Sequence, residues 1–291
     1  MEIFIAQLIS GLSLGSIYVL LVTGFNLMLL VAKIIQFAYP QIVVISMYTC
    51  WWALKITSNK LLIIIAGITV SVALSLLSEP IFRKISSIKD VDINATFIAS
   101  MGIAMIMMDV MSHSFNYGFP VAFPPKWIGG NILSFGLITI SKGQLFALVG
   151  GVIAVSVFFY LLYRTNQGRF FRAIAENRLA AELVGIPITK TSIFSYFIVG
   201  ILGGFSAILF SMLIGSASPW LGEFVALKML AVSIVAGLGN LHGGLVCGLL
   251  LGIIEAIAVG YISGSWSNVI AFVIMLAVIL IKPEGLFGTK I

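Results

Sequence analysis

The side chains that could carry out catalysis are too few and too scattered in this sequence to form an enzyme site. His113 and His242 lie in different regions, and neither belongs to a His-Glu-x-x-His zinc motif. No Gly-rich loop followed by Lys and Ser or Thr is present to hold the phosphates of ATP. Cys50 and Cys247 sit inside apolar runs, where a cysteine is ordinarily a small buried side chain. We therefore expect no catalytic residue, no bound metal and no cofactor in this chain.

Three ionisable side chains lie in or near apolar segments. A charge at the centre of a bilayer costs roughly 2.5–3.5 kcal/mol on insertion scales, so such residues are candidates for function. Asp109 and Lys228 lie close to the expected outer ends of their segments, which predicts that both meet water or lipid headgroups. Glu255 lies well inside its segment, and we predict an intramembrane carboxylate paired with a neighbouring helix.

Two interruptions of apolar helix are candidates for a translocation path. Pro40 ends the first, 33–41, and four glycines with Asn240 and His242 make up most of the second, 237–244. Non-helical backbone at membrane depth needs protein or a water-filled cavity to satisfy its polar groups, and paired interruptions mark the path in many transporters. The alternative is an ordinary turn between two helices. The predicted path residues are Gln36, Phe37, Tyr39, Pro40, Gln41, Gly237, Gly239, Asn240 and His242.

The least apolar stretch, 164–190, is predicted to hold a short amphipathic helix. Its Ala-rich sequence favours helix, and Gly185 followed by Pro187 is predicted to end it. Such a helix in an exposed loop suits docking into a groove of another protein. The alternative is a helix that lies on the lipid headgroups through its arginines.

The elements that position these residues are predicted to be membrane helices. Of the 291 residues, 60% are hydrophobic and 9% charged, against about 25% charged in a typical soluble domain. The mean hydropathy of +1.17 extends along the whole length. We predict an all-α membrane protein with one transmembrane domain spanning 1–291. The net charge of +6 is spread between the apolar segments, which indicates membrane topology and not binding to nucleic acid.

Division at charges and at Pro/Gly clusters gives eight or nine transmembrane helices, because a helix needs about 20 apolar residues to cross a bilayer. Two segments, 40–55 and 225–239, are too short to span upright. Close glycines such as Gly11 with Gly15, or Gly248 with Gly252, predict tight helix packing. The candidate segments are 5–31, 40–55, 61–78, 94–111, 142–163, 191–213, 225–239, 244–260 and 267–281.

Charge predicts the orientation of the bundle. The loops 79–93 and 164–190 carry the basic residues and are predicted to be cytoplasmic, while 112–141, rich in aromatic residues, is predicted to be external. Counting spans from these loops places the N-terminus outside and the C-terminal segment inside. The first apolar run lacks a basic start and a cleavage site, so we expect a retained span.

Several short motifs resemble one family along nearly the whole chain: the LivH-type permease subunits of bacterial branched-chain amino-acid ABC importers. The motifs are Leu14-Gly-Ser-Ile-Tyr18, Gln36-Phe-Ala-Tyr-Pro40, Gly168-Arg169 with Ala175-Glu176, Leu183-Val-Gly-Ile186, Ala236-Gly-Leu-Gly239, Gly243-Gly244 and Pro283-Glu-Gly-Leu-Phe-Gly288. Where the family usually has Asn-Phe-Ala-His-Gly, this chain has Tyr39 and Pro40 in place of His and Gly, which puts substrate preference in question.

The resemblance implies an ABC importer permease fold in the bacterial cytoplasmic (inner) membrane, surrounded by lipid. It implies that 168–186 is a coupling helix docking onto ATPase subunits that bind the ATP. It also implies a periplasmic or extracellular substrate-binding protein, and a second permease subunit, LivM-like or another copy, that completes the pore. The implied coupling residues are Gly168, Arg169, Arg172, Glu176, Ala180, Ala181, Glu182 and Gly185.

Two other functions stay open. The same architecture could move urea or short amides. An ion-coupled secondary transporter would need buried carboxylates or histidines near the midplane, for which Glu255 is the best candidate.

Overall fold

The computed structural model describes residues 2–86, 93–135, 138–262, 264–282 and 284–288. Nine helices of 15 residues or more in these ranges match the nine predicted segments one for one. They are α1 (Glu2–Ala32), α2 (Tyr39–Ile56), α3 (Lys60–Ser86), α4 (Ile93–Ser114), α6 (Lys142–Arg164), α9 (Ile188–Ile214), α10 (Leu221–Ala236), α11 (Leu241–Tyr261) and α12 (Ser267–Ile281). The shorter helices are α5 (Pro125–Ile128), α7 (Asn166–Glu176) and α8 (Arg178–Leu183), with 3-10 turns at Asn116–Gly118 and Gly264–Trp266.

Six of the described helices, α1, α3, α4, α6, α9 and α11, are long and apolar enough to cross a membrane. The 18 residues of α2 and the 16 of α10 rise roughly 27 and 24 Å, short of the hydrocarbon thickness of about 30 Å. These are the two segments predicted to be too short. The bundle therefore combines full spans with two shorter helices, of which α2 begins and α10 ends at an interruption.

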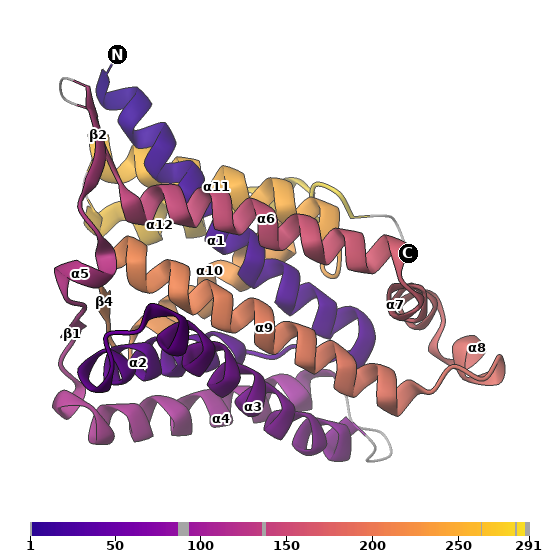
Figure 1. Ribbon diagram of the computed structural model, residues 1–291. Coiled ribbons are helices and arrows are strands. Elements are labelled where there is room, and N and C mark those ends of the chain that lie inside the picture. Colours follow the sequence, from indigo (N-terminus) through magenta and orange to yellow (C-terminus); the bar gives the residue numbers. More distant parts are fainter. Residues whose placement is uncertain (1, 87–92, 136–137, 263, 283, 289–291) are drawn as a thin grey trace.

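The most buried helix is α1, which crosses the middle of the bundle and packs against α6, α9 and α11 (Figure 1). Its closest partner is α11, and glycines bring the two backbones together. A Cβ on Gly252 would lie 2.3 Å from the Cα of Gly15, and one on Gly11 would lie 2.6 Å from the Cα of Ile253. The predicted tight packing at these glycines is confirmed.

A second close pair joins α3 and α9. A Cβ on Gly200 would lie 2.6 Å from the Cα of Val72, and the Ser75 hydroxyl donates a hydrogen bond of 2.7 Å to the Tyr196 carbonyl. Lipid tails are as apolar as the helices, so the hydrophobic effect does not drive helices together in a membrane. Close contact at glycines and hydrogen bonds from hydroxyl groups hold them together instead.

Short strands gather at one end of the bundle beside the start of α1 and α5 (Figure 1). β1 (Val121–Ala122) pairs antiparallel with β4 (Ser216–Ala217), and β2 (Asn131–Phe135) pairs antiparallel with β3 (Ile138–Ser141). This is the predicted external loop. Its Trp127 is buried, with the indole N–H donating to the Ser211 hydroxyl at 2.8 Å, while Tyr117 is exposed.

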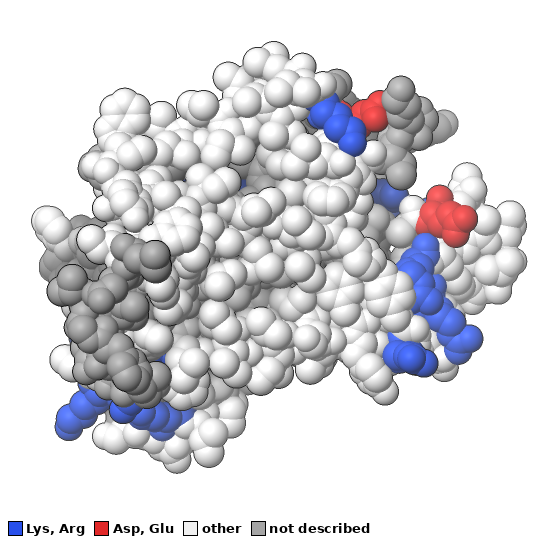
Figure 2. Space-filling view, turned by 90° about the horizontal axis from the view of Figure 1, so that it is seen from above, with Lys and Arg blue, Asp and Glu red and all other residues white. Residues whose placement is uncertain are grey.

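The opposite end holds α7 and α8 (Figure 1), which belong to the loop predicted to be cytoplasmic. Lys89 and most of the loop after α3 lie outside the described residues. On the face in Figure 2, charged side chains gather toward the ends, and a broad uncharged surface lies between them. Large apolar side chains, among them Ile106 and Val157, are exposed on the surface of the single chain. The chain is a multi-pass membrane protein.

Candidate functional site

The first interruption is buried protein backbone between α1 and α2. Phe37 donates its backbone N–H to the Ser100 hydroxyl at 2.8 Å, and that hydroxyl donates in turn to the Ile35 carbonyl at 3.1 Å. Gln36 is fully buried and donates to the Ser78 hydroxyl. Pro40 lies in the first turn of α2, where no intrahelical donor is required, so it begins a helix and does not kink one.

Two of the predicted path residues face a common cavity. Phe37 and Gln41 line a space of about 50 Å³ against Met105 of α4 and Gly222 of α10. The side-chain carbonyl of Gln41 is buried without a hydrogen-bond partner among the described residues, and glycine at 222 leaves the room beside it. The cavity thus offers the amide of Gln41 and the acidic residue Glu223 within otherwise apolar walls.

Tyr39 lies elsewhere. Its ring packs between Gly24 of α1 and Gly203 of α9, and its buried hydroxyl has no partner among the described residues. Of the residues at the first interruption, the cavity therefore takes Phe37 and Gln41, while Gln36 faces α3 and Tyr39 faces α9.

The second interruption is a tight turn between α10 and α11. Gly237 and Gly239 have positive φ angles of 93° and 83°, which favour glycine. Asn240 begins α11, accepting from the Gly243 N–H at 2.8 Å, and its amide donates to the Phe287 carbonyl at 2.7 Å. His242 hydrogen-bonds to the Tyr163 hydroxyl of α6. These side chains hold the turn, and they do not line the cavity at Gln41.

Asn26 of α1 is a buried residue that the sequence reasoning missed. Its side-chain carbonyl accepts from the Ser233 hydroxyl and from the Gly239 N–H, and its amide donates to the Asn240 carbonyl at 3.2 Å. One side chain thereby ties α1 and α10 to the second interruption. The signal was a lone Asn in an otherwise apolar span, since a buried amide needs partners.

Lys228 and Glu255 form an ion pair inside the bundle. Their closest atoms, Nζ and Oε1, are 2.6 Å apart, and Tyr18 donates to Glu255 Oε2 at 2.8 Å. Glu255 has the helix neighbour that was predicted. The interfacial prediction for Lys228 is wrong, because the carboxylate of α11 and the Tyr18 hydroxyl satisfy its charge in the interior. Asp109 is exposed and pairs with His113.

The cytoplasmic segment 168–186, predicted as one helix, is two. Asn177 has extended backbone angles (φ −151°, ψ 106°), and its side chain accepts from the Ala180 N–H at 3.0 Å, which starts a new helix. Gly185, with φ 86°, follows the end of α8 as predicted. The prediction of one continuous helix is wrong, because an asparagine cap interrupts it.

The two helices differ in what they bury. α7 packs Phe171 and Ile174 against the bundle, and Gly168 fits where a Cβ would strike the Leu162 carbonyl. Arg172 donates to that same carbonyl, and Arg169 donates to Asn166. α8 buries only Ala181 of its six residues, whereas Leu179 is 74% and Leu183 is 88% exposed. Ala180, Glu176 and Glu182 are not buried. The described residues contain no cluster of three His, Cys, Asp or Glu that could hold a metal.

Residues 7–279 match the family described as "Branched-chain amino acid transport system / permease component". The chain belongs to this permease family. It is 23% identical to the high-affinity branched-chain amino acid permease LivH of Salmonella typhimurium, covering 98% of this chain and 96% of that one. It is 27% identical to a probable LivH of Methanocaldococcus jannaschii, covering 94% and 89%.

The fold is similar to a solved structure with little sequence likeness. PsaBC from Streptococcus pneumoniae, in complex with Fab, aligns with a TM-score of 0.55 at 13% identity, covering 98% of this permease and 93% of that chain. The LivH-type resemblance inferred from the short motifs is confirmed by the family match. The permease is accordingly a transport protein with interrupted helices.

Proposed function

We propose that this permease is the membrane subunit of an ABC importer that moves branched-chain or related hydrophobic amino acids across the bacterial cytoplasmic membrane, driven by a separate ATPase. The observation that carries the proposal is α8, a short helix at the predicted cytoplasmic end whose Leu179 and Leu183 are exposed in the single chain. An apolar helix face outside the membrane is costly unless a partner covers it. The family relationship supports an ATPase as that partner.

The cavity at Phe37 and Gln41 is the proposed path. Its walls include Met101 and Met105 of α4, which are 42% and 60% exposed in the single chain. A second permease subunit, LivM-like or another copy, would cover that face and close the path. Flexible thioether side chains adapt to apolar ligands of different shape, which suits hydrophobic amino acids delivered by a periplasmic or extracellular binding protein.

Transport of urea or short amides is the alternative within the same class, because the unpaired side-chain carbonyl of Gln41 would suit either substrate. A proton-coupled carrier is disfavoured by the ion pair at Glu255, since a proton on that carboxylate would leave Lys228 charged and unpaired in the interior.

The experiment is substitution on α8. Leu183→Glu places a charge on the proposed contact, and we expect loss of ATPase co-purification together with uptake of radiolabelled leucine. Ile281→Glu is the matched control, because Ile281 is also exposed (84%) but lies at the end of α12. It should keep both activities. Normal uptake and normal co-purification with Leu183→Glu would refute the coupling role.

A further inference from the structure

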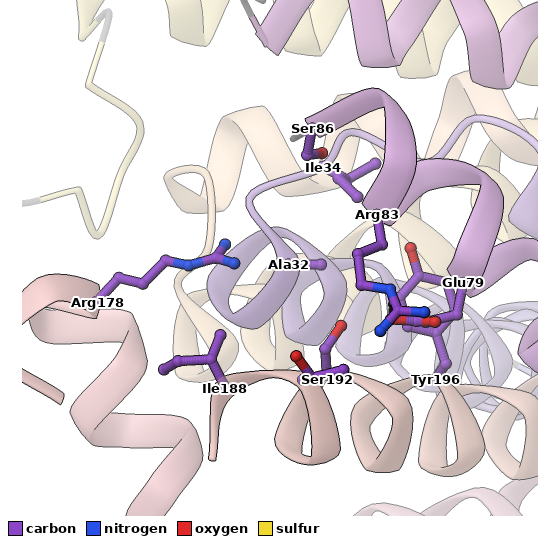
Figure 3. A pocket seen from close by; sticks show the side chains of 10 residues that line it. Ala32, Ile34, Glu79, Arg83, Ser86, Arg178, Ile188, Ser192 and Tyr196 are labelled. Atoms are coloured by element: carbon purple, nitrogen blue, oxygen red, sulfur yellow. Dashed lines mark ion pairs between the residues drawn. The ribbon is translucent and has the colours of Figure 1, made fainter. Parts of the chain in front are cut away.

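A second, larger cavity lies at the cytoplasmic end of the chain and is separate from the proposed path. It has a volume of about 160 Å³ and is formed by the ends of α1 and α3, the beginning of α8 and the first turns of α9 (Figure 3). On its α3 side, Glu79 and Arg83 form an ion pair of 3.5 Å. Arg178 of α8 extends from the opposite side toward Ala32 (Figure 3).

The polar groups of this cavity are buried but incompletely bonded. The Glu79 side chain is 4% exposed, and its Oε1 faces Arg83 Nε at 3.5 Å without accepting a hydrogen bond from any described residue. The hydroxyl of Tyr196, a residue 1% exposed, also lacks a partner among them. Buried polar atoms are nearly always hydrogen-bonded in folded proteins. Two buried groups that lack a hydrogen bond, on the wall of one cavity, point to a ligand that supplies the missing bonds.

The charges and walls select the chemistry of that ligand. Arg83 is paired with Glu79, whereas Arg178 has no carboxylate partner among the described residues, which favours a ligand carrying a carboxylate. Glu79 Oε1 needs a donor, which an ammonium group provides. Ile34 and Ile188 supply an apolar wall. A simple anion would use Arg178 alone, whereas a zwitterion with a small aliphatic side chain also gives Glu79 Oε1 a hydrogen-bond donor and contacts the apolar wall.

We propose that this cavity binds a small aliphatic amino acid from the cytoplasm. Its carboxylate is held by Arg178, its ammonium by Glu79, and its side chain by Ile188. Bound there, the ligand bridges α8 to α3 and restrains the helix assigned to ATPase docking. Accumulated product therefore slows further import. This regulatory consequence depends on the proposed function, but the binding itself does not.

The test is binding to the full-length chain in nanodiscs of phosphatidylcholine, followed by calorimetry with L-leucine. Wild type should bind saturably, and Glu79→Gln and Arg178→Gln should each weaken binding at least tenfold. Arg178 is exposed, so its variant keeps the fold if the buried Glu79 variant does not. Lys190→Gln removes an exposed cation nearby on α9 and should bind as wild type.

Three results would overturn the proposal. The first is unchanged affinity in both Glu79→Gln and Arg178→Gln. The second is displacement of leucine by inorganic phosphate, or by nanodiscs containing phosphatidylglycerol, which would make this a phosphate or headgroup site. The third is loss of leucine binding in Gln41→Ala alone. Wild type that binds leucine here but fails in uptake would instead refute the import function and leave this site standing.

Discussion

The ion pair between Lys228 and Glu255 makes each residue dependent on the other. Removing one partner leaves an uncompensated charge in the interior, which costs about 3–5 kcal/mol. We expect Lys228→Met and Glu255→Gln each to lower the free energy of unfolding in mixed micelles by that amount. The double variant should recover most of the loss, since no charge is then left alone.

The exposed pair of Asp109 and His113 is the matched control, because both side chains are more than 70% exposed. Asp109→Asn should change stability by at most about 1 kcal/mol. If the losses of the two interior single variants simply add in the double variant, then the two side chains are not energetically coupled.

These residues also mark the limit of sequence reasoning at this scale. The intramembrane position of Glu255 could be predicted from its own segment. The buried position of Lys228 could not be predicted, because its partner is on another helix. Whether a charge is tolerated in the interior depends on that partner. Asn26 was missed for the same reason, since its bonds to Ser233 and Gly239 join positions far apart in the chain.

At the scale of elements, the contact of α1 with α11 depends on glycine at the crossing. Gly252→Ala would place a Cβ 2.3 Å from the Gly15 Cα, and backbone cannot give way as a flexible side chain can. Overpacking of this kind costs about 1–3 kcal/mol or more. We expect a lower melting temperature for this variant of the reconstituted permease.

Gly102→Ala on α4 is the control, because a Cβ there meets nothing within 4 Å. Alanine is favoured over glycine inside a helix by roughly 0.5–1 kcal/mol, so this variant should melt at or above the wild-type temperature. A Gly252→Ala chain that melts no lower than Gly102→Ala would contradict the close approach of the two helices.

The helices themselves could be predicted because the length of an apolar segment and the charged residues that flank it can be read from that segment alone. All nine segments are helices, with ends shifted by a few residues, most at the cytoplasmic end of α3. The break at Asn177 was missed, although an asparagine followed by Arg-Leu-Ala-Ala is a capping signal. The composition on both sides of Asn177 favours helix. A continuous helix was therefore predicted, although Asn177 could also cap a new one. The roles assigned to the path and coupling residues stay predictions.

At the scale of the whole molecule, the side chains of the two helix interruptions do not meet, although the sequence suggested that the interruptions form a pair. The cavity at Gln41 lies between α4 and α10, while His242 faces α6, because Asn26 and Asn240 use the second interruption to fasten α10 and α11. The cavity at Gln41 and the cavity at Glu79 have no lining residue in common, so a single chain separates a proposed transport site from a proposed cytoplasmic one.

The predicted orientation of the bundle can be tested directly, because the strands lie at one end and α7 and α8 at the other (Figure 1). Lys126 lies beside the strands at the predicted outer end, and Leu183 lies on α8 at the other. We expect a membrane-impermeant maleimide to label Lys126→Cys in intact cells, and Leu183→Cys only after permeabilisation. Background should be low, since Cys50 and Cys247 are both buried. Labelling of Leu183→Cys in intact cells would reverse the topology, and with it the side from which an ATPase could reach α8.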